Sequence, residues 1–293
     1  MYTDFKKSGI IHKLLNKKIN DKLYDGISSL ELTEFIENEI KLYTKYDKKN
    51  PLKAGIGFPV GISINDIAAH FTPSIEHNPI IKGDDLVKID YGVHINGCIT
   101  DGAFSWCPSG KYNDLIQISK EATEIGIKNS GPDAILGSIG AAIQEVIESS
   151  EIEIDNKIIP IKSIRYLCGH QIKPYIIHAG KAVPNINLPY FERMLEDEIY
   201  AIETFPTTGD GTIYNDLECN HFMIQKNFTK EKQINNIYEE RTTLPFCPRW
   251  FEFEIPENRY ITKYPVIKTR DNGIVAQYEK TIYIKQNGVD VIN

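Results

Sequence analysis

Five side chains able to bind metal ions stand in separate local motifs of this sequence. They are Asp90 in VKIDYG, Asp101 in CITDGAF, His170 in LCGHQI, Glu203 in YAIETF and Glu279 in AQYEKTI. Four carboxylates and one imidazole suit a pair of hard or borderline divalent ions, because the carboxylate oxygens neutralise the charge while the single histidine breaks the symmetry of the ligand set. The residue types therefore predict a dinuclear metal hydrolase.

A β-hairpin would position the first two of these side chains. Two runs of β-branched and aromatic residues, 87–95 and 98–106, flank an Asn-Gly pair, which is the strongest short-range signal for a two-residue type I′ turn. Because strand side chains alternate with period two, this turn places Asp90 and Asp101 on one face as diagonal neighbours, about 7–8 Å apart at the backbone. Two carboxylates at that spacing can share two ions.

The composition is that of a globular protein with a substantial core. The 293 residues are 41% hydrophobic and carry a net charge of -7 with a pI near 5.6, so no overall basic field favours nucleic acid. The five cysteines form no CxxC pair, which argues against a disulfide framework or a zinc ribbon. No apolar run approaches the roughly 18 residues of a membrane span, and no secretion signal is recognised. We therefore expect a cytoplasmic protein without nucleic-acid or membrane partners.

Helical and strand patterns surround the metal-binding motifs. Residues 1–50 are predicted to form a helical lead-in, in which Ser28 and Glu31 make a capping box. Asn113 or Asp114 is predicted to cap another helix. Further predicted elements are a helix at 135–150 and strands at 158–166, 175–178, 199–205 and 275–285.

The order of these elements indicates an α+β fold, with helices gathered against a largely antiparallel sheet. No linker divides the chain, so we predict a single catalytic domain over residues 1–293. Between Phe222 and Leu244 the composition shifts to Lys, Asn, Gln and Glu, which indicates a surface insertion containing a helix. This insertion separates the Glu203 strand from the Glu279 strand.

Taken in chain order, the motifs resemble those of type 2 methionine aminopeptidases, metallopeptidases of family M24 with the pita-bread (creatinase/aminopeptidase-like) fold. The similar segments are GFP at 57–59, AHFTP at 69–73, KIDYG, ITDGAF, GHQI, IHAGKAVP, EIYAIETF, ECNHF and QYEKTIYI, which cover most of the chain after residue 50. The resemblance implies metal-dependent removal of the N-terminal methionine from nascent proteins and peptides, with preference for a small second residue.

The resemblance also implies roles for individual residues. Two divalent ions, of Co, Mn, Fe or Zn, would be held by Asp90, Asp101, His170, Glu203 and Glu279, with Asp101 and Glu279 bridging. His70 and His178 would donate to the scissile amide and stabilise the tetrahedral oxyanion. The methionine pocket would be lined by Phe58, Ile177, His221 and Tyr264, beside a helical insertion at about 222–256.

Such a site can hydrolyse a peptide bond. Two ions that share a water lower its pKa from about 15.7 to about 7, which supplies hydroxide at neutral pH, and one ion polarises the scissile carbonyl. An open position on an ion binds a free α-amino group, which selects amino-terminal substrates. Glu203 is the candidate general acid/base, because a ligand carboxylate can pass a proton from the water to the leaving amine.

Two other classes of protein share features with this sequence. Prolidase and aminopeptidase P enzymes have the same five ligands, but they usually carry a large amino-terminal domain, and only about fifty residues precede the first motif here. Catalytically silent pita-bread proteins that bind RNA or ribosomes lack intact ligands, whereas this chain has all five. The sequence favours the methionine aminopeptidase.

The expected partner is the N-terminal methionine of nascent polypeptides. No long charged extension precedes the first motif, so we expect at most transient proximity to the ribosome, and we expect a monomer. One residue departs from the family pattern: Lys280 follows Glu279 where histidine is common. Strand alternation predicts that Lys280 points to solvent on the opposite face of the sheet.

Overall fold

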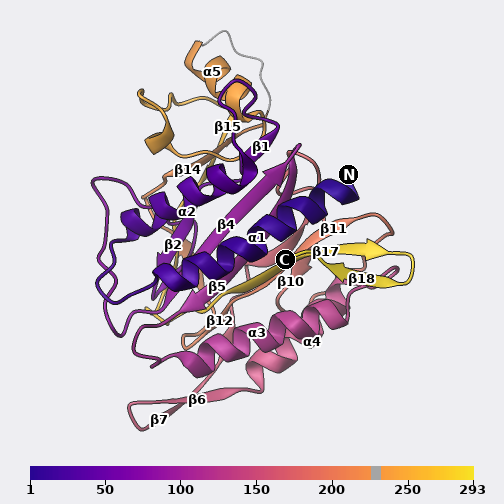
Figure 1. The fold of residues 1–293 in the computed structure, drawn as a ribbon. Helices are drawn as coiled ribbons and strands as arrows, with labels where there is room; N and C mark the ends of the chain where they lie inside the picture. Colours follow the sequence, from indigo (N-terminus) through magenta and orange to yellow (C-terminus); the bar gives the residue numbers. More distant parts are fainter. Residues whose placement is uncertain (226–231) are drawn as a thin grey trace.

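The structure is a computed structural model that describes residues 1–225 and 232–293, and it consists of helices packed against antiparallel sheets (Figure 1). The helices described are α1 (Tyr2–Lys22), α2 (Ser29–Thr44), α3 (Asn113–Lys128), α4 (Leu136–Glu148) and α5 (Lys232–Arg241), with a 3-10 turn at Pro248–Trp250. The strands described are β1 (Ala54–Ile56), β2 (Gly61–Ile64), β3 (Ile67–Ala69), β4 (Val87–Ile95), β5 (Cys98–Trp106), β6 (Glu151–Ile154), β7 (Lys157–Pro160), β8 (Lys162–Ser163), β9 (Cys168–Ile172), β10 (Ala182–Pro184), β11 (Ile199–Thr204), β12 (Pro206–Thr207), β13 (Ile213–Asn215), β14 (His221–Ile224), β15 (Ile261–Tyr264), β16 (Ile267–Thr269), β17 (Tyr278–Lys285) and β18 (Gly288–Val291).

The predicted hairpin is strands β4 and β5, and its register is the one that the Asn-Gly turn implies. Asp90 pairs with Ala103, and Gly92 pairs with Asp101. The two turn residues have φ of 49° and 78°, and a type I′ turn needs positive φ at both positions. The hairpin joins β1 and β2 in one sheet, because β4 also pairs with both of these strands.

The other three predicted metal-binding residues lie on a second sheet, with strand order β10-β9-β11-β17-β18. Glu203 on β11 stands directly opposite Glu279 on β17. His170 on β9 stands opposite Ala201, which is two residues before Glu203 on the same face of β11. Neighbouring strands therefore bring three residues that are far apart in the sequence to one face of this sheet.

Helices cover the opposite face of each sheet (Figure 1). Helices α1 and α2 pack on the first sheet, where Leu15 and Ile36 lie in one cluster with Ile89 and Tyr91 of β4. Helices α3 and α4 pack on the second sheet, in a cluster that includes Ile202 of β11 and Ile282 of β17. Since the odd-numbered positions of β4 face the helices, Asp90 must face away from them.

Three local predictions differ from the structure. The run 158–166 divides into β7 and β8, which belong to separate two-stranded sheets. The run 175–178 is a loop. The Ala179 N–H bonds to the Gln171 carbonyl, so the chain turns back between these residues instead of continuing as a strand. Helix α3 has Tyr112 at its N-cap position, with no side-chain cap bond, so neither Asn113 nor Asp114 caps it.

The helices predicted in residues 1–50 and at 135–150 are present, but the predicted capping box is only half formed. Ser28 is the N-cap of α2 and accepts a bond from the Glu31 N–H, but the Glu31 carboxylate bonds to Lys22 instead of completing the capping box. The helix predicted at 135–150 is α4. Among the described residues, no helix is long and apolar enough to cross a membrane.

The predicted insertion contains a helix, α5, flanked by the paired strands β14 and β15. Residues 226–231 of the predicted segment lie outside the described residues. Ile234 and Ile237 of α5 are fully buried in a cluster with Phe222, Ile224 and Phe246. The described part of the insertion therefore has its own small core, at the top of the molecule in Figure 1.

Candidate metal centre

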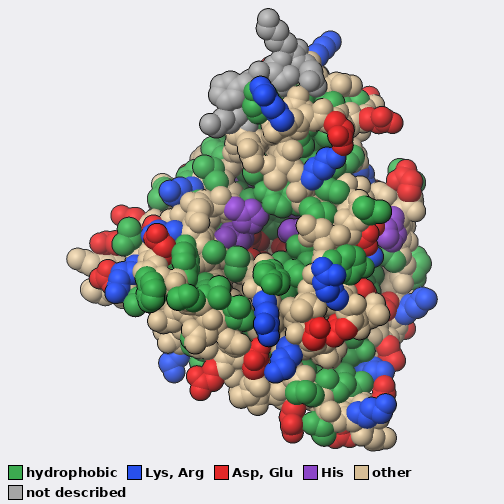
Figure 2. Space-filling view, turned by 180° about the vertical axis from the view of Figure 1, so that it is seen from behind, with side chains coloured by type: hydrophobic (Ala, Val, Ile, Leu, Met, Phe, Trp, Pro, Cys, Tyr) green, Lys and Arg blue, Asp and Glu red, His purple; other side chains and the backbone are tan. Residues whose placement is uncertain are grey.

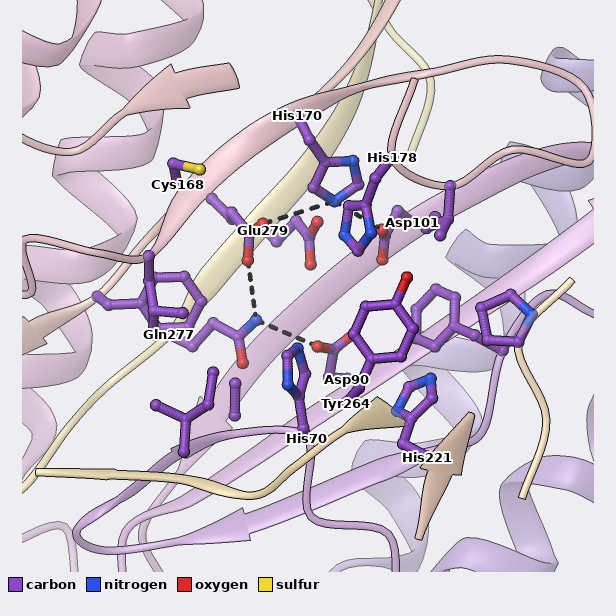
Figure 3. A pocket seen from close by; sticks show the side chains of 18 of the residues that line it. His70, Asp90, Asp101, Cys168, His170, His178, His221, Tyr264, Gln277 and Glu279 are labelled. Carbon is purple, nitrogen blue, oxygen red and sulfur yellow. Dashed lines mark hydrogen bonds and ion pairs between the residues drawn. The ribbon is translucent and has the colours of Figure 1, made fainter. Parts of the chain in front are cut away.

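The structure brings all five predicted metal ligands to one cavity between the two sheets. The His170 Nε2 atom is 3.5 Å from an Asp101 oxygen and 3.6 Å from a Glu203 oxygen. Ligand atoms of Asp101, His170 and Glu279 all lie within 4.8 Å of one another. The Gln277 side chain is hydrogen-bonded to both Asp90 and Glu203 and so connects Asp90 to the other predicted ligands; Figure 3 shows Gln277 beside Asp90.

Gln277 is a member of this site that the sequence prediction missed. Its side-chain amide donates to Asp90 Oδ2 at 3.2 Å and to Glu203 Oε2 at 3.4 Å, so it holds one oxygen of each carboxylate. Gln277 precedes Glu279 by two residues, and alternation along an extended chain places such a neighbour on the ligand face. Cys168, two residues before His170, lines the cavity for the same reason.

Hydroxyl groups connect the two sheets directly behind the ligands. The Thr281 hydroxyl lies 2.8 Å from both the Asp101 N–H and the Asp101 carbonyl, and it accepts from the first and donates to the second. The Asn293 side chain donates to the same carbonyl and accepts from the Thr281 N–H. The Ser105 hydroxyl makes an equivalent pair of bonds to the backbone of Gln277. The backbone of Asp101 is thus fixed by groups from β17 and the C-terminal residue.

The buried carboxylates have strongly perturbed acidities. Burial raises the pKa of Asp90 to about 7. Burial, followed by the charge of neighbouring carboxylates, raises the pKa values of Asp101, Glu203 and Glu279. Several carboxylates held this close together in a buried site disfavour one another's charged form. Positive charge bound in this site would therefore stabilise the ionised carboxylates.

Hydrogen bonding gives an independent test of whether cations fit here. One oxygen each of Asp90, Asp101 and Glu279 is buried and has no hydrogen-bond donor. Buried carboxylate oxygens normally have a partner, and oxygen ligands with negative charge are those that hard divalent cations prefer. The donor set thus fits divalent metal ions.

A group of aromatic rings closes the cavity above the carboxylates. The ring centres of His170 and His178 are 4.4 Å apart, and the rings of His70 and His221 each lie within 5.6 Å of the Tyr264 ring. His221 and Tyr264 are paired residues of β14 and β15, so the two strands that flank the insertion contribute this wall. Burial lowers the pKa values of His70 and His178 to about 4, which keeps both rings neutral at pH 7.

The predicted pocket residues line the same cavity, which has a volume of about 280 Å³. Phe58 packs on Gly92, where a Cβ atom would lie 2.4 Å from the Phe58 ring, so only glycine permits this contact. Lining residues that the prediction missed are Ala69, Tyr166, Leu167, Cys168, Phe205, Pro245, Ile267 and Gln277. Figure 2 shows histidine side chains at a hollow bordered by apolar side chains on the face away from α1.

Lys280 is on the opposite face from Glu279, as alternation predicts, but it does not extend into solvent. It is half-buried, and burial followed by the charges of Lys13 and Lys120 lowers its pKa. Lys13 belongs to α1 and Lys120 to α3, which pack on that side of the sheets. The opposite-face expectation holds, but Lys280 is only partly exposed to solvent because the helices pack on this side.

Comparison with known proteins identifies the family. A family model described as metallopeptidase family M24 matches residues 3–286. The chain belongs to metallopeptidase family M24. Methionine aminopeptidase 2 of Candida dubliniensis is 40% identical over 313 aligned positions, which cover 99% of the M24 chain and 69% of that relative. This identity over nearly the full chain confirms the resemblance to type 2 methionine aminopeptidases.

Solved structures confirm the fold of the M24 chain. A methionine aminopeptidase from Thermotoga maritima has a TM-score of 0.70 at 18% identity and covers 100% of this chain and 97% of its own. A protein described as a thermophilic Arx1 has a TM-score of 0.85 at 16% identity and covers 99% and 90%. At these identities the likeness concerns the fold alone. The α+β pita-bread prediction is confirmed, and membership of the family implies use of divalent metal.

Proposed function

We propose that this protein removes the N-terminal methionine from peptides and nascent proteins by metal-dependent hydrolysis of the first peptide bond. The observation that carries the proposal is that one cavity has metal-binding carboxylates at its base and an apolar, aromatic wall beside them. The carboxylates serve the hydrolysis, and the wall serves recognition of the methionine side chain. The curated relative at 40% identity, named methionine aminopeptidase 2, supports the same activity.

The five ligands would hold two divalent ions, of Mn, Fe, Co or Zn. When bound, the ions lower the pKa of a water molecule to about 7 and polarise the scissile carbonyl. The protein's own contribution is to place and orient the ligands. Gln277 fixes one oxygen each of Asp90 and Glu203, so the remaining oxygens are directed by the protein rather than by the ions.

His70 acts as a hydrogen-bond acceptor in this proposal. Its Nδ1 lies 3.2 Å from the Pro265 carbonyl, which can only accept, so Nδ1 carries the proton. Because burial lowers the His70 pKa to about 4, the ring is neutral and Nε2 has a free lone pair. Nε2 can then accept from the N–H of the scissile amide, whereas the sequence prediction made His70 a donor. His70 also has a left-handed backbone, with φ of 68°.

His178 supplies the donor. Burial, with the His70 charge as the second cause, lowers its pKa to about 4, so the neutral ring retains one N–H. Its ring lies against that of His170, at the edge of the ligand cluster where the substrate carbonyl must bind. An N–H at that position stabilises the charge that develops on the carbonyl oxygen.

Glu203 moves the proton. Its Oε2 accepts from Gln277, and its Oε1 lies 3.6 Å from His170 Nε2. Burial and the charge of Asp90 raise its pKa, which favours temporary protonation. Glu203 takes a proton from the attacking water and delivers it to the leaving amine, a role typically worth about 10²–10⁴-fold in rate.

The pocket wall accounts for the methionine preference. Phe58, Ile177, His221 and Tyr264 form a surface without a charged side chain, and Tyr264 already makes a 3.6 Å contact to the sulfur of Met223. A flexible thioether packs well against aromatic edges. The second residue of the substrate lies next to the metal-binding carboxylates at the base of the cavity. This position favours small side chains.

The test is release of free methionine from Met-Ala-Ser by the metal-loaded protein, beside an Ala-Pro peptide and an EDTA control. Cleavage of the first peptide alone, abolished by EDTA and by Glu203→Gln, is the expected result. Asp155→Asn, at an exposed carboxylate paired with Lys111, is the matched control that retains activity. Failure of the metal-loaded protein to cleave Met-Ala-Ser contradicts the proposal, and cleavage of Ala-Pro would favour a proline-directed enzyme.

A further inference from the structure

Arg241, the last residue of α5, is buried beside the pocket without contributing to it. It is 5% exposed, and its Nη2 atom donates to the carbonyls of Ile56, Gly57 and Pro245 at 2.9, 3.3 and 2.8 Å. Its guanidinium lies 4.9 Å from the centre of the Trp250 ring. Among the described residues the buried Nε of Arg241 has no hydrogen-bond partner, so the three carbonyl bonds of Nη2 are the polar contacts that offset burial of this guanidinium, and they hold the segments that carry those carbonyls beside it.

The three acceptors belong to the two segments that carry pocket residues. Gly57 directly precedes Phe58, whose ring is fixed on its other side by Gly92. Pro245 itself lines the cavity. The guanidinium therefore joins the loop after β1 to the segment that leaves α5, although the two are separated by more than 180 residues in the sequence.

The segment after Arg241 contacts the opposite wall as well. The Thr243 hydroxyl donates to the Tyr175 carbonyl in the loop that carries Ile177. Leu244 is fully buried in one cluster with Phe58 and Ile177. Residues 241–245 thus contact both apolar sides of the pocket. Arg241 is the charged residue whose hydrogen bonds hold this segment to the loop after β1.

We propose that Arg241 is a positioning residue for substrate selectivity, which fixes the distance between the Phe58 and Pro245 walls and so couples the insertion to the fit of the first side chain. This inference rests on the proposed function of the pocket. Arg241 touches neither the metal ligands nor the substrate. Its loss loosens the pocket without changing the chemistry of the carboxylate cluster.

The test compares Arg241→Met with Arg249→Met, a matched control in the same part of the fold. Arg249 bonds to Glu37 through two nitrogens, and its hydrogen bonds among the described residues go to Glu37 and not to residues 56–58. We expect Arg241→Met to raise the KM for Met-Ala-Ser about tenfold and to reduce the preference over Leu-Ala-Ser by a similar factor, with kcat and metal content little changed. Arg241→Lys, which retains a donor of shorter reach, restores part of the loss. Arg249→Met leaves KM and preference unchanged.

A wild-type KM and preference in Arg241→Met overturns the inference, as does an equal loss in Arg249→Met. Hydrogen exchange over residues 54–60 separates this outcome from failure of the proposed function, because it needs no turnover. Faster exchange there in Arg241→Met than in Arg249→Met supports the positioning role even if the wild type cleaves no methionine peptide. Unchanged exchange contradicts it.

Discussion

The base and the wall of the cavity are built in different ways. All five predicted metal ligands lie on strands whose registers are fixed by backbone ladders and by buried hydroxyl bonds, as between Thr281 and Asp101. The wall comes from the loop after β1, the loop after β9 and the short paired strands β14 and β15 beside the insertion. Hydrolysis needs ligands at fixed positions, whereas side-chain recognition depends on connecting segments that can vary without disturbing the sheets. The comparison predicts that changes at the base affect metal and chemistry, and changes in the wall affect selectivity.

The largest effect is expected from removal of a ligand at the base. Glu279→Gln should lower metal affinity by more than about 100-fold, because loss of a ligand exceeds the 10–100-fold cost of losing a supporting bond. Peptide turnover should disappear with the metal. Metal content after gel filtration and release of methionine measure the two effects. Glu257→Gln, at an exposed residue that follows the insertion, is the control. Full metal content in Glu279→Gln would contradict the ligand assignment.

A histidine on an irregular loop should affect chemistry without affecting metal. His178→Ala should reduce kcat about 10²-fold, because an oxyanion donor is lost, while metal content stays at the wild-type level. Steady-state kinetics and metal analysis provide the comparison with His77→Ala, an exposed histidine paired with Glu218. Unchanged kcat would remove His178 from the mechanism.

The hydroxyl bond behind Asp101 tests whether the base depends on its support. Thr281→Val keeps the shape but removes the group that bonds to the backbone of Asp101. We expect metal affinity to fall about 10–100-fold with little change in KM. Calorimetric titration with Mn²⁺ measures the affinity, and circular dichroism checks the fold. Wild-type affinity would show that the ladders alone fix the ligand.

The acidity of the base predicts how metal binding depends on pH. The pKa of Asp90 is raised to about 7 and those of its carboxylate neighbours are raised as well, so protons occupy these groups as pH falls and ions must displace them. Metal affinity should therefore rise with pH, by about tenfold per unit for each proton displaced. Titrations in buffers of different ionisation enthalpy measure the protons released. An affinity independent of pH between 6 and 8 would contradict these acidities.

The smallest effect is expected from Lys280, next to a ligand but on the helix-covered face. Lys280→Met should change metal affinity by less than about twofold, because Lys280 is on the opposite strand face from Glu279 and its ammonium group lies 5.3 Å from the centre of the Tyr278 ring. The same Mn²⁺ titration provides the measurement. A tenfold increase in metal affinity would mean that the positive charge of Lys280 acts on the metal site through the strand. The two faces of the strand would then not be electrostatically separate.

The base was the more predictable region from the sequence. The Asn-Gly turn and the alternating residues of 87–106 determine the hairpin register, which the structure confirms. Each ligand stands in a local motif, so its identity could be inferred without knowing where the other ligands lie. The roles of these residues and the single domain remain predictions, since geometry places the side chains together but does not test what they do.

The supporting residues could not be predicted, because their partners are distant in the sequence. Thr281 and Asn293 resemble ordinary strand and terminal residues until the fold brings Asp101 beside them. The loop at 175–178 has β-branched residues typical of a strand, yet the bond from Ala179 to Gln171 turns it back toward the cavity. In each case a tertiary contact overrides the local pattern.

The sequence by itself determined the types of the predicted ligands, their order along the chain, the hairpin and the resemblance to the family. Local patterns suffice for these features, because alternation and turn geometry act over a few residues. Only the tertiary structure decided which groups hold Asp101, which tautomer His70 adopts and how Arg241 joins the insertion to the pocket. Those features depend on donors and acceptors that meet only when the sheets and the insertion are packed together.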